Sequence, residues 1–180
     1  EAEWENQRVT RPALPPAEME RIRAFFARPE YEKPGSNQQE YIEKLRTNEG
    51  FAEWVRANVV EHKQNGYAIV NISLKPEGGI PGDATAVQMD AVADLAEKYS
   101  MDEIRVTHQQ NLVLPNVRQA DLYVMWEELS AQGLATNNSG LISNISACPR
   151  LEYCVLATAR PHAVAHRNGV RLLVVVAGDD

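Results

Sequence analysis

Residues 67–74 carry the clearest alternation of hydrophobic and polar positions in the chain. The apolar side of this segment consists of Ala68, Val70, Ile72 and Leu74. Successive side chains of a β-strand point to opposite faces of the sheet, so the pattern predicts a half-buried strand.

The pattern changes to a helical period after Gly82. Thr85 and Gln88 have the spacing of a capping box, in which each side chain binds the other residue's backbone N–H. The predicted buried stripe of this helix consists of Met89, Val92, Ala93, Leu95, Ala96 and Tyr99. Two short strands over Glu103–Thr107 and Asn111–Leu114 follow, and then a helix over Gln119–Gln132.

Residues 66–133 therefore predict the order β-α-β-β-α, which needs one more strand to complete a ferredoxin-like unit. Upstream, helical spacing predicts helices over residues 17–26, 38–45 and 51–60. The expected fold class is α+β: a ferredoxin-like β-α-β-β-α unit with a helical N-terminal extension and an incomplete C-terminal α/β segment.

Charge and composition narrow the classes of function. The net charge of −7 leaves no basic surplus to neutralise phosphates, so a nucleic-acid partner is not expected. No apolar run approaches the length of a membrane span and no signal peptide is recognisable, so no membrane partner is expected either. Two cysteines without an export signal predict reduced thiols and a cytoplasmic location.

Cys148 and Cys154 are the two cysteines of the chain, with five residues between them. Thiolates bind iron and zinc, and both iron–sulfur clusters and structural zinc take four ligands. The pair is therefore a candidate half of a metal site, with buried structural cysteines as the alternative. His162 and His166 stand four residues apart, which leaves a Cys2His2 zinc site as a further alternative.

Arg105, Thr107, Gln109 and Asn111 occupy every second position of the predicted hairpin. Those that lie in strands share a face. A guanidinium, a hydroxyl and two amides suit the recognition of a carboxylate or phosphate group. A solvated sheet face is the alternative reading of the same pattern.

Three segments in fixed order resemble the assimilatory nitrite/sulfite reductase haemoprotein family. They are Gly82-Asp-Ala-Thr-Ala-Val-Gln-Met-Asp-Ala-Val-Ala-Asp-Leu-Ala96, Ile104-Arg-Val-Thr-His-Gln-Gln-Asn-Leu-Val-Leu114 and Ala147-Cys-Pro-Arg-Leu-Glu-Tyr-Cys154. The resemblance extends from the N-terminal region to about Ala159.

This resemblance implies a sirohaem coupled to a [4Fe-4S] cluster that reduces sulfite to sulfide, or nitrite to ammonia, with six electrons. Cys148 and Cys154 match the family's C-x5-C motif and would be two of the four cluster ligands. Arg105, Thr107, Gln109 and Asn111 match the hairpin motif that faces sirohaem and the anion. The implied partners are sulfite or nitrite, a ferredoxin or flavoprotein electron donor, and the remainder of the reductase.

The chain also departs from the family pattern. The second cysteine pair, C-x3-C, is absent, Arg150 replaces a usual glycine, and the sequence from about residue 161 is off-pattern. We therefore expect a fragment of a reductase that is inactive alone, with a non-enzymatic α+β binding module as the alternative. The expected division is 1–65 (lead-in and helices), 66–135 (ferredoxin-like half-domain) and 136–180 (start of a sirohaem/[4Fe-4S] domain).

Overall fold

The computed structural model divides into two compact units, Glu1–Glu32 and Lys33–Asp180. Each unit is described by itself. The structure describes residues 14–27, 29–32, 38–76, 79–148, 154–156, 158 and 163–168. Within these residues, no helix combines the length and the apolar character that crossing a bilayer requires.

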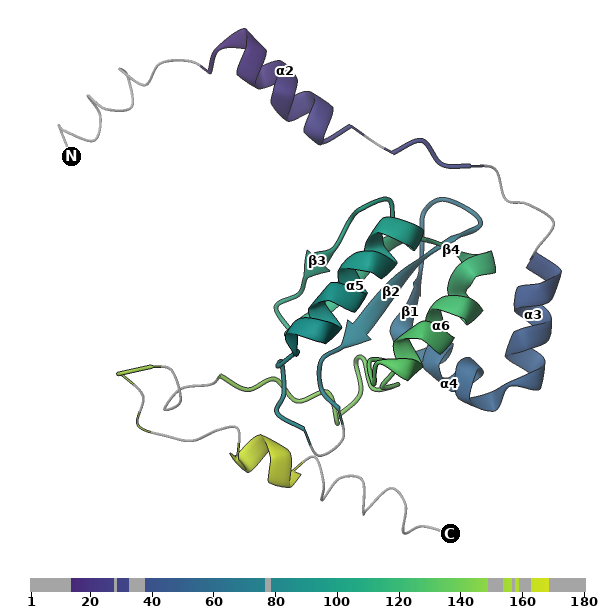
Figure 1. The fold of residues 1–180 in the computed structure, drawn as a ribbon, viewed down its shortest axis with the longest axis vertical. Coiled ribbons are helices and arrows are strands. Elements are labelled where there is room, and N and C mark those ends of the chain that lie inside the picture. Colours follow the sequence, from purple (N-terminus) through teal and green to yellow (C-terminus); the bar gives the residue numbers. More distant parts are fainter. Residues whose placement is uncertain are drawn as a thin grey trace. The chain divides into compact units, whose positions relative to one another are not determined.

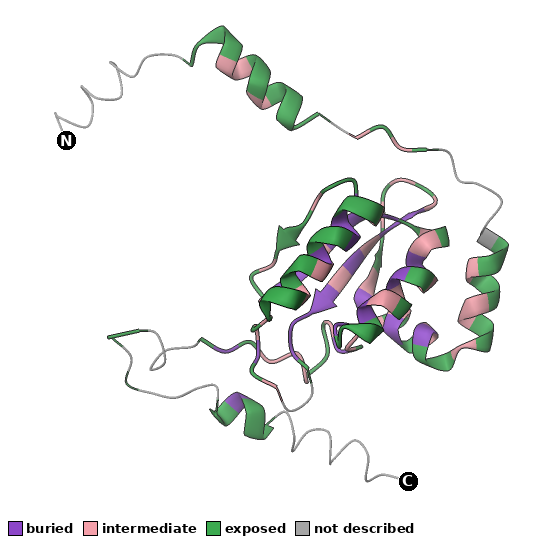
Figure 2. Ribbon diagram, viewed as in Figure 1, coloured by how far each residue is buried: buried purple, intermediate pink, exposed green. Residues whose placement is uncertain are grey.

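The first unit contains one helix, α2, over Pro16–Phe25. It lies one residue ahead of the predicted range and begins with a proline, whose fixed φ and missing N–H suit the first helical turn. Glu18 and Arg21 form an ion pair across one turn at 2.7 Å. No residue of α2 is buried, so local interactions account for the helix (Figure 2).

Two helices open the second unit: α3 over Gln38–Thr47 and α4 over Glu49–Asn58. Asn48 separates them, and its side chain caps α4 by accepting a hydrogen bond from the N–H of Phe51 at 2.9 Å. Phe51 and Trp54 of α4 are almost fully buried. Their rings stack, with centroids 6.2 Å apart, and anchor α4 in the core.

The helix predicted over 51–60 is wrong at its last two positions. Val59 and Val60 belong instead to strand β1, Val59–Glu61, which pairs antiparallel with the strand that follows. Val59 has an extended backbone, with φ −107° and ψ 128°. Two β-branched residues beside an open strand edge favour pairing over a further helical turn.

Four antiparallel strands form the sheet, in the order β1-β2-β4-β3 (Figure 1). Strand β2 spans Tyr67–Ser73, β3 spans Arg105–Val106 and β4 spans Asn111–Arg118. Helix α5, Ala86–Tyr99, connects β2 to β3, and α6, Leu122–Ala131, follows β4 after a short 3-10 turn at Gln119–Asp121. The predicted β-α-β-β-α order is confirmed. The fourth strand, β1, comes from upstream.

The hydrophobic core lies between one face of the sheet and helices α4, α5 and α6. The sheet contributes Ala68, Val70, Ile72, Leu112, Leu114 and Val117, and the last two helices contribute Val92, Leu95, Ala96, Leu122, Met125 and Leu129. The capping box of Thr85 and Gln88 is present at the start of α5. Two predicted members of the α5 stripe, Met89 and Ala93, are exposed.

The positions of Met89 and Ala93 explain their exposure. Ala93 is rotated by about 100° from Val92 and by about 60° from Ala96, so it lies beside the buried stripe. Met89 belongs to the first turn of α5, ahead of the first buried residue of the helix, Val92, and it is 46% exposed.

Leu129→Ala is expected to lower the free energy of unfolding by about 2 to 5 kcal/mol, because it opens a cavity in a fully buried part of the core. Leu141, which is 55% exposed, offers a matched control. Its replacement by alanine should change stability by less than about 0.5 kcal/mol. Urea unfolding followed by circular dichroism measures both. Equal losses in the two variants would contradict this assignment of the core.

Candidate functional site

The hairpin of β3 and β4 carries four residues that the sequence singled out. Arg105 pairs with Val113 and Val106 pairs with Leu112. The tip closes through the N–H of Thr107, which donates to the carbonyl of Asn111 at 2.9 Å. Gln110 adopts a left-handed backbone, with φ +57°, to complete this tight turn.

Strand register places Arg105 and Asn111 on one face of the sheet, as predicted for those of the four residues that lie in strands. Arg105 lies opposite Val113, and Asn111 is two residues before Val113 on the same strand, so the side chains of Arg105 and Asn111 share a direction. This is the face away from the hydrophobic core, because Leu112 and Leu114 point to the core side. Thr107 follows the end of β3, and its hydroxyl accepts a hydrogen bond from the N–H of Asn111 at 3.1 Å. Gln109 lies in the turn and is exposed.

These residues differ in how available they are to a ligand. Arg105 is exposed and binds Glu103 at 2.6 Å. Asn111 is 1% exposed and is held inside the protein by several hydrogen bonds. Arg105 and Gln109 can therefore meet a ligand from solvent, whereas Asn111 supports the hairpin from within.

Lys75 is a buried lysine beside the hairpin tip that the sequence did not single out. It is 4% exposed. Its ammonium group donates to the carbonyl of Gln109, to the carbonyl of Gln110 at 3.2 Å and to Oδ1 of Asn111 at 2.6 Å. Burial lowers the pKa of Lys75 to about 8. The one sequence signal was a lysine directly after an alternating strand.

A chain of asparagines extends this hydrogen-bond network to residues 138–144. Nδ2 of Asn111 donates to Oδ1 of Asn144 at 3.3 Å, and Nδ2 of Asn144 donates to Oγ of Ser73 at 3.1 Å. Nδ2 of Asn138 donates to the carbonyl of Lys75 at 3.1 Å. Buried polar groups that satisfy one another fix a single arrangement of the segments that carry them. The network therefore attaches the segment after α6 to the end of the sheet.

The segment next reaches the hairpin tip itself. Gln110 Nε2 donates to the carbonyl of Ala147 at 2.9 Å, and the N–H of Ala147 donates to Gln110 Oε1 at 3.0 Å. The hydroxyl of Ser146 donates to the carbonyl of Gln109 at 3.1 Å. Cys148, the next residue, thus follows directly from a stretch that is anchored to the hairpin.

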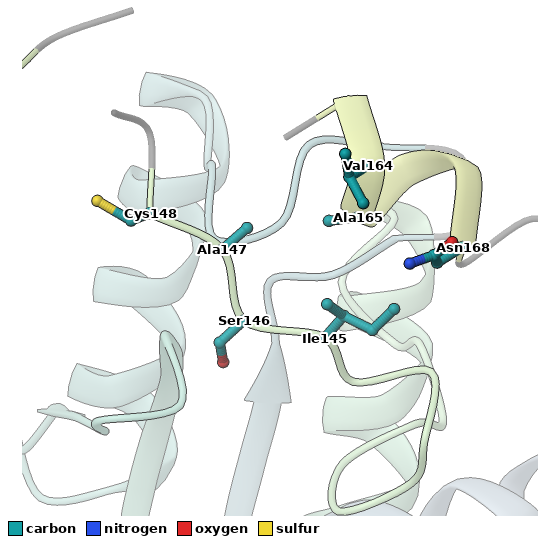
Figure 3. A pocket seen from close by; sticks show the side chains of 7 residues that line it. All are labelled: Ile145, Ser146, Ala147, Cys148, Val164, Ala165 and Asn168. Atoms are coloured by element: carbon teal, nitrogen blue, oxygen red, sulfur yellow. The ribbon is translucent and has the colours of Figure 1, made fainter. Parts of the chain in front are cut away.

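Cys148 and Cys154 are both free, exposed thiols. Cys148 lies at the rim of a cavity of about 320 Å³ that Ile145, Val164, Ala165 and Asn168 also line. Figure 3 shows its sulfur pointing away from the Val164 and Ala165 side chains. The thiol is therefore presented outward and not into this cavity.

The described residues contain no group of three or more histidine, cysteine or acidic side chains that could hold a metal ion. Two accessible thiols fit a thiolate-ligated metal centre as half of a four-ligand set. His166 is exposed, in the short helix of residues 163–168. His162 and Arg150 lie outside the described residues, as does most of the off-pattern tail from residue 161.

Residues 61–132 match the protein family described as Nitrite/Sulfite reductase ferredoxin-like half domain. The fold and the hairpin site thus define an α+β domain of the ferredoxin-like class. The similarity to the nitrite/sulfite reductase family thus lies in residues 61–132, which contain β2, α5, β3, β4 and α6.

Proteins of two kinds are similar to the chain over about half of its length. The chloroplastic ferredoxin–nitrite reductase of Zea mays is 34% identical over 94 residues, which cover 51% of this chain and 16% of that protein. The sulfite reductase [ferredoxin] 2 of Mycolicibacterium paratuberculosis is 33% identical over 100 residues, or 56% of this chain and 17% of that protein. The chain thus spans about a sixth of the length of these relatives.

The titration of Lys75 is expected to make stability depend on pH. Between pH 8 and 10.5 the unfolded chain keeps the proton of Lys75 that the folded chain has released. The unfolded state then binds more protons, so the free energy of unfolding rises with pH, by at most about 1.4 kcal/mol per pH unit.

Lys75→Met should remove this contribution from the pH slope. The variant should also be less stable at pH 7, because it removes the donor to the carbonyl of Gln110 and to the buried Oδ1 of Asn111. Urea unfolding at several pH values from 8 to 10.5 compares the slopes of the two proteins. Parallel curves would contradict the titration of Lys75 in this window.

Proposed function

We propose that the chain provides a ferredoxin-like half-domain and two cluster ligands of a sirohaem- and [4Fe-4S]-dependent reductase of sulfite or nitrite. The observation that carries this proposal is the anchoring of the cysteine segment to the hairpin tip. Residues 146–147, which come after the matched half-domain, bind the tip of its hairpin through three hydrogen bonds. Cys148 is the next residue in the chain. The proposed ligand segment and the proposed sirohaem face thereby meet at one place.

When bound, the coupled cofactors would supply the electrons for the reduction of sulfite to sulfide or nitrite to ammonia. The residues of this chain would bind and orient. Arg105 and Gln109, exposed at the hairpin, would contact the acid groups of sirohaem or the anion, and Thr107 and Asn111 would shape the turn that presents them. Cys148 and Cys154 would ligate the cluster.

The number of cluster ligands that this chain contains limits what it can do alone. A [4Fe-4S] cluster takes four ligands, and this chain has two cysteines. Further thiolates have to come from outside it, so the chain by itself should not reduce either anion. The electron donor would be a ferredoxin or a flavoprotein. The cytoplasmic location stays part of the proposal, because both thiols are free and a reducing compartment keeps them so.

The division of the chain into residues 1–65, 66–135 and 136–180 also belongs to this proposal. Within the third of these segments, residues 138–147 bind the end of the sheet through the polar network. A non-enzymatic α+β binding module is the second candidate. It is favoured by the same shortage of ligands, since the described residues hold no complete metal site.

Reconstitution with ferrous iron, sulfide and a small thiol is expected to give a brown chain that contains iron and acid-labile sulfide. The small thiol would occupy the ligand positions that the chain does not fill. Cys148→Ser and Cys154→Ser should each abolish the colour, whereas Ser143→Ala, a change in the same segment that removes no thiol, should keep it. Iron analysis and the visible absorption spectrum measure the outcome.

A colourless, well-folded chain after reconstitution would instead favour the binding module. Zinc that copurifies with the chain and is lost in His166→Ala would favour the Cys2His2 alternative. Sulfite and nitrite reduction, assayed with a chemical electron donor, should be absent from the isolated chain. A measurable rate would contradict the expected lack of activity.

Arg105→Ala is expected to weaken sirohaem binding to the chain by about 3- to 10-fold, because it removes a charge-assisted hydrogen bond to a carboxylate. Quenching of tryptophan fluorescence on addition of sirohaem measures the affinity. Arg56→Ala removes the same charge from an exposed position on α4 and should leave the affinity unchanged. Equal weakening by both variants would mean that overall charge, and not the hairpin, attracts the ligand.

A further inference from the structure

The carboxamide of Gln110 binds both backbone groups of a single residue, Ala147. The amide nitrogen donates to the carbonyl at 2.9 Å and the amide oxygen accepts from the N–H at 3.0 Å. One such bond fixes a distance, whereas two antiparallel bonds also fix the direction of the peptide. Gln110 therefore determines where the chain points as it leaves Ala147.

Gln110 is itself held in place at its backbone and along its side chain. Its N–H donates to the carbonyl of Thr107 at 3.1 Å, and its carbonyl accepts from the ammonium group of Lys75 at 3.2 Å. The side chain lies against Gly82, where an added Cβ would come within 3.2 to 3.3 Å of Gln110 atoms. Gly82 also has φ +86°, so the position favours glycine on two grounds.

Ser146 provides a second anchor next to the first. Its hydroxyl donates to the carbonyl of Gln109 at 3.1 Å. Ala147 is 7% exposed, whereas the thiol of Cys148 beside it is exposed and free. The boundary between anchored backbone and accessible thiol therefore falls between residues 147 and 148.

We infer that Gln110 is a positioning residue for Cys148: it holds the peptide of Ala147 and so presents the thiolate to a metal centre before the metal arrives. The inference rests on the proposed role of Cys148 as a cluster ligand and adds the residue that orients it. A ligand held in its bound position loses less conformational freedom on binding, which raises affinity.

The two hydrogen bonds between the Gln110 carboxamide and the backbone of Ala147 are called the clasp below. Hydrogen exchange of the Ala147 amide tests the clasp in the metal-free chain. Gln110→Ala removes the acceptor of that amide and should speed its exchange by about 3- to 10-fold. Gln110→Glu keeps an acceptor oxygen and removes the donor, so it should give a smaller increase. Gln132→Ala, at an exposed glutamine on the end of α6, is the matched control and should change nothing.

Protection of the Val70 and Leu114 amides in the sheet reports whether each variant is folded. If Gln110→Ala unfolds the chain, those amides lose protection, and Gln110→Glu then decides the question alone. Unchanged exchange at Ala147 in every folded Gln110 variant would overturn the inference.

Binding of Co²⁺ tests whether the clasp positions the thiolate. Cobalt bound to thiolate gives a sulfur-to-metal charge-transfer band, and Cys148→Ser defines the signal that depends on this residue. Gln110→Ala should weaken the Cys148-dependent affinity by about 3- to 10-fold, and Gln132→Ala should not. Faster exchange at Ala147 with unaltered cobalt affinity would overturn the positioning role. Absence of the Cys148-dependent band in the unaltered chain would overturn the proposed ligand, while the exchange result still reports on the clasp.

Discussion

The candidate site depends on the hydrogen bonds that the ammonium group of Lys75 donates to the hairpin tip. The ammonium group is buried, and its three donors meet acceptors on three consecutive residues, Gln109, Gln110 and Asn111. Burying a charged group is unfavourable unless hydrogen bonds replace those it loses to water. Because the acceptors all belong to one hairpin tip, the tip satisfies the ammonium only in the conformation that gathers them. The buried charge thus selects the shape of the turn.

Strand β4, which follows this turn, presents different kinds of side chain on its two faces. Strand β4 presents Leu112 and Leu114 to the core and Asn111 to the opposite side. A shift of one residue in its pairing would bury the asparagine among apolar side chains and expose both leucines. The burial of these leucines therefore fixes the register of Asn111 as well. Hydrophobic packing on one face of the strand thus positions the polar side chains on the other face.

Much of the fold could be predicted because its signals are local. Alternation at residues 67–74, the capping box at Thr85 and the periodicity that follows it each operate within a few residues. Strand β1 could not be predicted in this way. Val59 and Val60 continue a helical pattern in sequence, and only the edge of β2, which lies beyond a turn, makes them a strand.

In the candidate site, too, features with local signals could be predicted and features that depend on distant residues could not. The residue types and alternation of Arg105, Thr107 and Asn111 were visible in the sequence, and the register bears out a common face for the two strand residues, Arg105 and Asn111. The role of Lys75 was not visible in the sequence, because the acceptors of its hydrogen bonds lie 34 to 36 residues further along the chain. The link from Gln110 to Ala147, 37 residues apart, was hidden for the same reason. Interactions at such separations leave no periodic trace in a single sequence.

These long-range hydrogen bonds bear on the proposal that Cys148 and Cys154 are two ligands of a metal centre that needs further ligands from outside the chain. Residues 146–147 directly precede Cys148 and lie against the hairpin tip. They bind it through three hydrogen bonds, and the hairpin is in turn shaped by Lys75. The placement of Cys148 is therefore a property of the ferredoxin-like half-domain. A cluster held partly by other thiolates would meet a ligand whose position was already determined by the folding of this unit.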